Sequence, residues 1–506
     1  MTLILHQKPV NSTLKLPVIT NWTPLIGYML FKDANISALF YYKLIMEVWL
    51  GTVTVFDGSQ GTLIAKMKQR RNGFSSDIAN NKARAFFDIG KIVNTQLVDT
   101  ENDQNQDGLP FETIHTLGAN TGVTDKIFSH SGDRDTGKTQ LASITVRGYQ
   151  ESSNSASESP QVSTTGAVSE TLYYIQASLP LTTDRSFIST SSSYDSTYIQ
   201  GDALATYQYS ALNTNKRFLS DVPRIQRPGF TGSAHFVDVN IGDFHTVAFF
   251  NGVSDFDNPL LFLKIEYFNE SGLMSTNYFS QNAASGGFTP YATVDTSVVP
   301  ALTKTDAQRL LYFGCGPANL EAQTINSFAQ PSNNSGFTYY TVQGVDNALS
   351  NRTAIYHFVK SSGSCKNFKV RRLAFRNSLG AYDYFNFSMK STQKVTVSRD
   401  TYGSMLGVFN KSKYRYDDSQ RGKTVSKTTA VLKETLNTDY LTESEAGLVE
   451  KLLMSSNVYV VQNADTENTE PVVVTSSSHI RKTIVNDNLI QYTIEIEYAN
   501  QLNTNS

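Results

Sequence analysis

Residues 132–139 come closest in this chain to a recognised binding motif. They read Gly-Asp-Arg-Asp-Thr-Gly-Lys-Thr and fit the pattern of a phosphate-binding loop. That chemistry requires a helix directly after the Lys-Thr pair, because the first amides of the helix cradle the phosphates. Here residues 141–147 follow, and the alternation of Ile144 and Val146 with polar neighbours predicts a strand instead. Two aspartates also lie where phosphate would bind, so we expect a polar hairpin loop without nucleotide.

A second candidate site is the acidic stretch at residues 103–108, which reads Asp-Gln-Asn-Gln-Asp-Gly. Oxygen-bearing side chains at positions one, three and five, followed by glycine at six, match the start of a calcium-binding loop. The glutamate expected at position twelve is absent because Ile114 stands there, and Glu112 is out of register. The pattern leaves open whether Asp103 to Asp107 bind calcium, and it favours a solvated acidic turn.

The seven histidines do not fall into a catalytic or zinc-binding spacing. His235 and His245 flank Asp238 and Asp243, an arrangement that brings ligands together only across a hairpin, and ordinary structural histidines fit it better. No G-x-S-x-G nucleophile elbow occurs. The two carboxylates of a glycosidase need not be near each other in sequence, so that arrangement stays open. We therefore assign no catalytic, cofactor or metal residues and expect no enzyme activity.

Two further features are ambiguous in the sequence. Cys315 and Cys365 are too few for a disulfide framework, and whether they form a single bridge is left open. The basic run at residues 369–372, Lys-Val-Arg-Arg, lies on a predicted strand. It favours a solvated basic face, with ion pairs to acids of a neighbour as the alternative.

The overall charge and hydropathy exclude two classes of partner. The formal net charge is −2, so the chain has no global basic field that attracts nucleic acid. The most apolar early stretch, residues 38–56, contains Lys43 and Glu47 and alternates at the strand period, so it predicts a strand rather than a membrane span. The first residues lack the apolar run of a signal peptide. We expect synthesis in a cytosol-like compartment.

The composition predicts a mainly β protein. A length of 506 residues indicates several domains. The 26 Tyr and 29 Phe, with Ser, Thr and Asn in place of charge, fit twisted sheets and polar turns. We expect a multi-domain β-sandwich architecture with one clear C-terminal helix. The expected divisions are an N-terminal β domain at 1–115, a central sandwich at 116–345 with a Ser-rich loop at 150–170, and a C-terminal β domain at 346–506. A short helical turn is predicted at 84–93.

The C-terminal third has the clearest local pattern. Thr442 and Glu445 form a capping box that predicts the start of the helix at 441–455. At residues 491–498, Tyr492, Ile494, Ile496 and Tyr498 alternate with polar residues, which predicts a strand with one buried face. We expect that face to pack against the helix or a neighbouring strand.

Several phrases of the sequence resemble those of structural virion proteins from environmental tailed bacteriophages, which are associated with the tail, neck or baseplate. The phrases lie at 85–93, 217–224, 314–320, 376–387, 441–453 and 492–500. The resemblance implies a subunit of a symmetric ring, located in the virion and made in the host cytoplasm. It implies copies of the chain itself and other virion proteins as partners, and it carries no active-site motif.

Three hypotheses follow. The favoured one is a structural ring component of the tail, baseplate or neck, because low charge and abundant aromatics suit extensive protein contacts. The second is a receptor- or carbohydrate-binding virion module, which needs an exposed aromatic patch with polar groups nearby. The third is a virion-associated glycosidase, which needs two carboxylates that face each other across a cleft.

Overall fold

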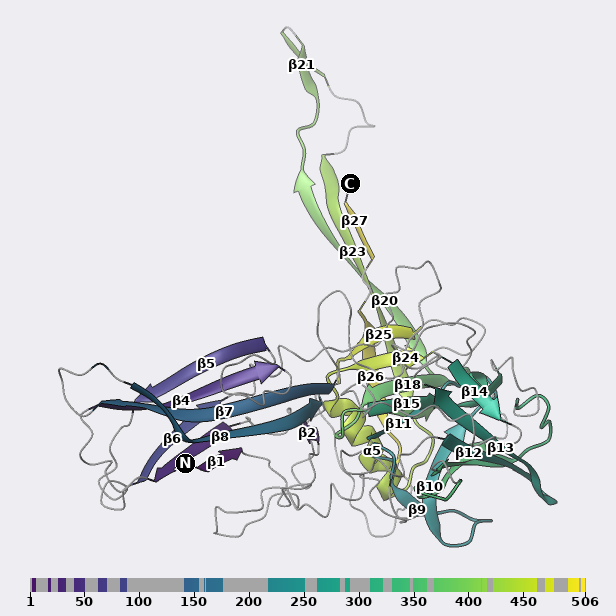
Figure 1. The fold of residues 1–506 in the computed structure, drawn as a ribbon. Coiled ribbons are helices and arrows are strands. Elements are labelled where there is room, and N and C mark those ends of the chain that lie inside the picture. Colours follow the sequence, from purple (N-terminus) through teal and green to yellow (C-terminus); the bar gives the residue numbers. More distant parts are fainter. Residues whose placement is uncertain are drawn as a thin grey trace.

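The chain folds mainly into β-sheets, as the composition predicts (Figure 1). This architecture comes from a computed structural model of the full sequence. The structure describes residues 2–5, 17–19, 26–32, 41–50, 62–70, 82–88, 141–153, 159, 161–175, 217–250, 262–282, 287–291, 310–321, 330–345, 349–361, 368–410, 412–415, 422–461, 469–476, 490–499 and 502–505. In this part of the chain, no helix has the length and hydropathy needed to cross a membrane.

The N-terminal strands form two sheets that contact each other through β1 and β8 and through β5 and β6. The smaller has the order β1 (Thr2–Leu5), β3 (Ile26–Lys32) and β6 (Lys82–Asp88). The larger has the order β2 (Pro17–Ile19), β8 (Gln161–Ile175), β7 (Leu141–Ser153), β4 (Tyr41–Leu50) and β5 (Thr62–Arg70).

A seven-stranded sheet follows in the middle of the chain. Its order is β14 (Gly287–Tyr291), β13 (Gly272–Asn282), β12 (Phe262–Asn269), β16 (Tyr339–Val345), β17 (Tyr356–Lys360), β10 (Ser233–Val239) and β9 (Arg224–Gln226). Strands β10 and β17 pair in parallel, and the other pairs of this sheet are antiparallel. A separate pair, β11 (Thr246–Phe250) and β15 (Leu310–Gly314), leads into the short helix α4 (Pro317–Glu321).

An eight-stranded sheet is built from the C-terminal third. Its order is β19 (Tyr382–Phe387), β18 (Arg371–Arg376), β24 (Val458–Val461), β25 (Thr469–Val474), β26 (Thr493–Tyr498), β23 (Lys423–Asn437) and β20 (Thr392–Gly403), and β27 (Leu502–Asn505) also pairs with β23. Figure 1 shows β20 and β23 extending out of the body, with β21 (Val408–Asn410) at their far end. Strand β21 pairs with β22 (Lys413–Arg415).

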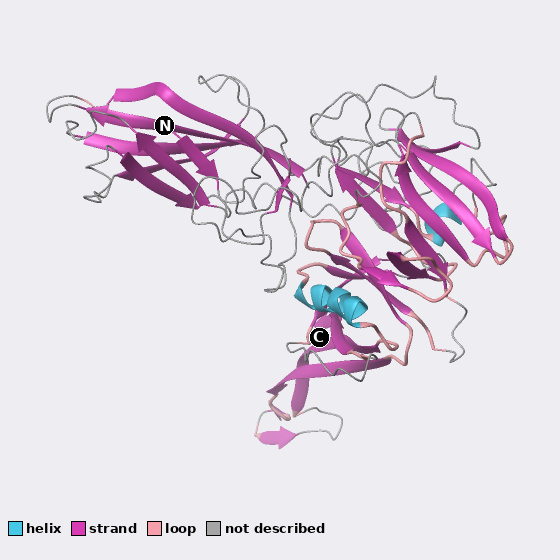
Figure 2. Ribbon diagram, turned by 90° about the horizontal axis from the view of Figure 1, so that it is seen from below, coloured by secondary structure: helices cyan, strands magenta, loops and turns pink. Residues whose placement is uncertain are grey.

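One apolar core joins the seven-stranded and eight-stranded sheets. Val237 and Tyr340 of the first sheet belong to the same buried cluster as Phe375 and Ile496 of the second. Helix α5 (Glu443–Met454) adds Leu452 to that cluster and lies beside the strands in Figure 2. A shared core between two sheets is the sandwich-like arrangement that the sequence predicts.

The predicted helix at 441–455 and the predicted strand at 491–498 are confirmed as α5 and β26. Thr442 caps α5, accepting a hydrogen bond from the backbone N–H of Glu445, whose carboxylate accepts one from the N–H of Thr442. Along β26 the side chains of Ile494 and Ile496 are buried, whereas Glu495 between them is exposed. Strand alternation therefore places the apolar face inward against the cluster that contains α5.

Two local predictions are wrong. Residues 82–88 form strand β6 rather than a helical turn, because every residue of this stretch pairs with β3. Within the expected loop at 150–170, β7 continues to Ser153 and β8 begins at Gln161. Backbone pairing between the two strands, such as Gln150 with Ser163, holds this Ser-rich sequence in a sheet despite its low apolar content.

The expected domain boundaries do not coincide with the sheets. Strand β4 pairs with β7, which brings together residues on both sides of position 115. Strand β10 pairs with β17, which does the same across position 345. Sheet pairing between distant segments is not visible in local composition, which was the basis of those boundaries.

Candidate functional site

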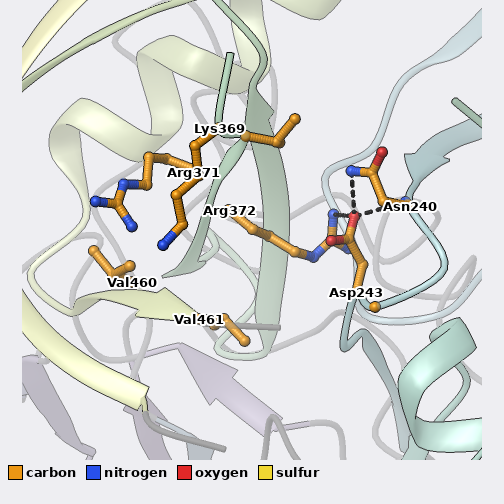
Figure 3. Close-up of a pocket in the computed structure, with 9 residues that line it drawn as sticks. Asn240, Asp243, Lys369, Arg371, Arg372, Val460 and Val461 are labelled. Atoms are coloured by element: carbon orange, nitrogen blue, oxygen red, sulfur yellow. Dashed lines mark hydrogen bonds and ion pairs between the residues drawn. The ribbon is translucent and has the colours of Figure 1, made fainter. Parts of the chain in front are cut away.

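A pocket of about 230 Å³ opens where the loop after β10 meets β18 and β24 (Figure 3). The basic run at the start of β18 forms one wall, and two valines of β24 form another. The full lining consists of Asn240, Gly242, Asp243, Lys369, Val370, Arg371, Arg372, Val460 and Val461.

The two arginines of the wall have different internal partners. Successive strand residues point to opposite faces of a sheet. Arg371 donates from Nε to the Glu434 carboxylate at 2.8 Å, whereas Arg372 extends toward the loop that carries Asp243. The interpretation of this run as a solvated basic face is therefore wrong for Arg372, which is 3% exposed.

Arg372 is saturated with hydrogen-bond acceptors. Its Nε donates to the Phe244 carbonyl at 2.8 Å and its Nη1 to the Asn386 side-chain oxygen at 2.7 Å. Nη1 also lies 3.4 Å from the Asp243 carboxylate, and the guanidinium stacks over the Tyr384 ring. A guanidinium carries only five N–H donors, so this one has little capacity left for a ligand.

The geometry around Arg372 also determines the protonation of His245. Nη2 of Arg372 lies 2.9 Å from Nδ1 of His245. Because arginine is always a donor, Nδ1 must accept, which leaves the imidazole neutral with its proton on Nε2. The backbone N–H of His245 donates to the Asn319 side chain at 2.8 Å, so α4 is attached to the same cluster.

Asp243 is equally committed to internal contacts. Its Oδ2 accepts from the backbone N–H of Asn240 at 2.8 Å and from the Asn386 amide at 3.1 Å. Lys369 is exposed, and its ammonium group makes no ion pair with the described residues. The nine lining residues include no hydroxyl, thiol or imidazole. The pocket can thus hold a small anion near Lys369, but its lining offers no nucleophile with an activating base.

A second polar cluster lies beyond β18 and centres on Asp383 of β19. Its carboxylate accepts from the Ser220 hydroxyl at 2.6 Å, from the backbone N–H of Asp221 at 2.7 Å and from the Asn377 amide at 3.1 Å. Asp221 in turn accepts from the Ser378 hydroxyl at 2.8 Å and from the Lys451 ammonium of α5 at 2.9 Å. The cluster connects the segment before β9, the turn before β19 and helix α5.

Burial and a neighbouring carboxylate perturb Asp383. Burial, together with the negative charge of Asp221, raises the pKa of Asp383 to about 7, while the hydrogen bonds that it accepts oppose the rise. A raised carboxyl pKa is typical of catalytic acids. Here, however, Asp383 is 1% exposed and both its oxygens accept hydrogen bonds from protein groups. The arrangement fits an internal connection better than a substrate site.

The remaining candidates from the sequence divide into two groups. Residues 103–108, residues 132–139 and Cys365 lie outside the described residues, although the strand predicted to follow residue 139 is confirmed as β7. His235 is buried, stacks on Tyr356, and its Nδ1 donates to the Val222 carbonyl at 2.8 Å. Burial lowers the pKa of His235 to about 4, so it is a neutral core histidine.

Metal and thiol chemistry has little support in the part of the chain that the structure describes. There, no three His, Cys, Asp or Glu side chains gather closely enough to hold a metal ion. His235 and His245 belong to different clusters, so the structure does not bring them together across a hairpin. Cys315 is a free, buried thiol, and burial raises its pKa, which makes it unreactive.

Sequence patterns singled out Asp243, His245 and the run that contains Arg372 but not the cluster that they form, and they did not single out Asp383. Asp383 lies between Tyr382 and Tyr384 in a mostly aromatic strand, and Arg372 precedes Leu373 in a buried one. A charged residue inside an apolar stretch is the signal that could have identified them, because burial of a charge requires a partner.

Comparison with known proteins does not extend this description. A scan of the sequence against protein-family models finds no match, and a search of curated proteins finds none either. The geometry of the described residues is therefore the basis for a functional proposal.

Proposed function

We propose that this chain is a non-catalytic structural subunit of a tailed-phage virion, a ring component of the tail, baseplate or neck. It would be made in the host cytoplasm and located in the virion, with copies of itself and other virion proteins as partners. The proposal rests on the resemblance of several sequence phrases to structural virion proteins and on the contacts that these phrases make in the fold.

The observation that carries the proposal is the convergence of three phrases on one buried polar cluster, with a fourth in the adjoining apolar core. Ser220 and Asp221 belong to the phrase at 217–224, and Asn377, Ser378 and Asp383 belong to that at 376–387. Helix α5 joins through Lys451, and the phrase at 492–500 provides strand β26 of the same core.

The phrase at 314–320 has a comparable structural role beside the polar cluster around Arg372. Asn319 holds the backbone of His245, and Tyr340 donates from its hydroxyl to the Cys315 carbonyl at 2.8 Å. A Cβ at Gly316 would lie 2.6 Å from the Asp243 carbonyl and closer still to the His245 backbone nitrogen, so only glycine fits there. These contacts support a scaffold role, because the polar groups of these residues bond to other protein groups and do not line a cavity for a ligand.

A second candidate function is a carbohydrate- or receptor-binding virion module. The observation that favours it is a pair of exposed tyrosines, Tyr402 and Tyr414, on the extension formed by β20 to β23. Tyrosine rings stack on sugar faces, and their hydroxyl groups add polar contacts.

The proposal is tested by imaging and complementation. Negative-stain images of the purified chain are expected to show closed rings, and a phage that lacks this protein is expected to give particles without a complete tail. Infectivity should return with the wild-type gene and also with Lys138→Ala, since no nucleotide site is expected there. Monomers in the images, together with normal tails on the deletion phage, contradict the proposal. Glycan binding that is lost in Tyr402→Ala supports the second candidate instead.

A further inference from the structure

The feature that carries a further inference is the extension formed by β20, β21, β22 and β23, here called the arm (residues 392–437). Figure 1 shows it projecting from the body. Every residue of β20 is exposed along its whole length, whereas β18 of the same sheet is largely buried. The arm therefore presents a long ladder of strand backbone that the body of the same chain does not cover.

The arm is held at a defined position by a buried anchor at its root. Glu434 of β23 accepts from Arg371 of β18 at 2.8 Å, from the Tyr498 hydroxyl of β26 at 2.8 Å and from the Gln393 amide of β20 at 3.2 Å. Burial alone would raise the pKa of Glu434, but these hydrogen bonds outweigh it and hold the pKa below its usual value. An isolated hairpin is marginal in water, so this anchor, together with the pairing of β23 with β26 and β27, stabilises the arm.

Among the described strands, none pairs with the outer edge of the arm. Strand β23 is covered on its far side by β26 and then by β27, while β20 is the last strand of the sheet. Alternate residues of β20 therefore direct their backbone N–H and C=O groups away from β23. Long exposed edges are usually shortened, bulged or charged to prevent pairing with another chain. Strand β20 carries Lys394, Arg399 and Asp400 and one bulge, between Asp400 and Thr401, whereas the pairing before the bulge is regular.

Apolar side chains are exposed along the same arm. Val395 is 61% exposed and Met405 is 81% exposed, and Val397, Tyr402, Leu406 and Tyr414 are also exposed. Val395 pairs with Leu432, and Val397 pairs with Ala430, so these four residues form an apolar strip on one face of the hairpin. Exposed apolar groups next to an open strand edge mark a protein contact surface.

The charge of the arm is complementary to the charge of the rest of the chain. Its described residues include seven basic side chains and two acidic ones, a net charge of +5. Because the whole chain has a net charge of −2, the remainder carries −7. The remainder of a second copy therefore has a net charge opposite to that of the arm, and opposite charges favour that encounter over contact between two arms.

We propose that the arm of one copy docks on a second copy of this chain, with the open edge of β20 and the apolar strip in the contact. This inference rests on the proposed role as a self-assembling ring subunit and names the surface that joins the copies. Nucleic acid fits the arm less well, because phosphates satisfy neither the apolar strip nor the unpaired N–H and C=O groups of a strand edge. A head-to-tail contact of this kind closes into a ring when the rotation between copies allows it.

The test is sedimentation of the full-length chain with two arm variants and a matched control. Val395→Glu/Val397→Glu places charge on the strip, and Lys394→Glu/Arg399→Glu reverses charge on β20. The control, Leu273→Glu/Val473→Glu, changes two side chains away from the arm that are 57% and 58% exposed. We expect each arm variant to raise the apparent dissociation constant by about tenfold or more, and the control to leave it within about twofold.

Further measurements separate the possible outcomes. Circular dichroism and thermal unfolding should be the same for all variants, since every substituted side chain is exposed. A photo-crosslinking residue at position 395 should capture a peptide of a second copy. Wild-type assembly that is unchanged in both arm variants overturns this inference and leaves the proposed function intact. A wild-type chain that stays monomeric overturns both, and arm-dependent retardation of a DNA duplex without self-association replaces the second copy with nucleic acid.

Discussion

The body around Arg372 and Asp383 differs from the arm in how it uses polar and apolar groups. In the body, Arg372 and Asp383 are almost fully buried, and each is surrounded by acceptors or donors from distant segments. In the arm, apolar residues such as Val395 are exposed and strand edges are open. Buried paired charges specify how segments of one chain fit together, whereas exposed apolar strands remain available for another chain. The body thus determines the folding of one chain, and the arm is available for association between chains. Substitutions in the body should therefore change stability, and substitutions in the arm should change association.

The largest effect is expected from Ile494→Asp in β26, because this side chain is 1% exposed in the apolar core. An unpaired buried carboxylate should lower the free energy of unfolding by several kcal/mol, about the whole stability of a marginal domain. Thermal unfolding and recovery of soluble protein measure the loss. Val473→Asp in the neighbouring strand β25, where the side chain is exposed, is the control and should change stability by less than about 1 kcal/mol. Equal effects of the two variants would contradict the buried-face assignment.

Arg372→Met should also destabilise the body strongly. Removal of the guanidinium takes away the donor to the Phe244 carbonyl and the counter-charge of Asp243, and loss of one partner from a buried ion pair costs about 3–5 kcal/mol. Chemical denaturation measures this change. The double variant Arg372→Met/Asp243→Asn should recover part of the loss, because the stranded charge is then absent. No recovery would show that packing rather than charge determines the effect.

Glu434→Gln should affect the arm more than the body. The substitution keeps the shape of the side chain but leaves Arg371 without its counter-charge, at a cost of about 1–3 kcal/mol. Hydrogen exchange should become faster in β20 and in the distal half of β23, with little change in β18 and β19. Gln393→Ala, which removes the longest of the three hydrogen bonds to Glu434, is the milder control. Uniform acceleration across the sheet would argue against an anchor that is specific to the arm.

The smallest effect is a pH dependence from Asp383. Its pKa is raised to about 7 in the folded protein, above its ordinary 3.8, so the folded state holds more protons between these values. The stability that the neutral carboxyl contributes is fully present below pH 3.8 and is lost as pH rises through 7. We expect the difference in unfolding midpoint, wild type minus Asp383→Asn, to decrease as the pH rises from 5 to 8.

Subtracting the unfolding midpoint of Asp383→Asn from that of the wild type also removes the contributions of other titrating groups. His235 acts in the opposite direction, because burial lowers its pKa to about 4 and its contribution is lost as pH falls. His235 is present in both proteins and cancels. The facing charges are those of Asp221 and, through it, Lys451, and both are also unchanged. A flat or rising difference would show that Asp383 stays ionised in the folded state.

Strand alternation and the capping box were enough to predict strand β26 and helix α5 in the C-terminal third. They succeeded there because Ile494 and Thr442 follow local rules of spacing. The same rules failed for β6, where pairing with β3 overrides a helical pattern, and for the strands on either side of residues 154–160.

The polar clusters could not be predicted from local patterns. Ser220 and Asp383 are 163 positions apart, and Arg372 and Asp243 are 129 positions apart. Their partnership is a property of the folded chain and not of the spacing in any one segment. A basic pair next to buried strand residues looks the same in sequence whether it faces solvent or the interior, which is why the run at 369–372 was misinterpreted.

The parallel pairing of β10 with β17 has a consequence for synthesis and folding. The two strands meet at Val237 and Phe358, and the strands between them form most of the same sheet. A growing chain on the ribosome cannot close this sheet until residue 360 has emerged, so strand edges stay exposed meanwhile. Contacts of such long sequence separation slow folding and increase the risk of aggregation. Production of this protein should therefore benefit from slow translation at low temperature and from chaperones.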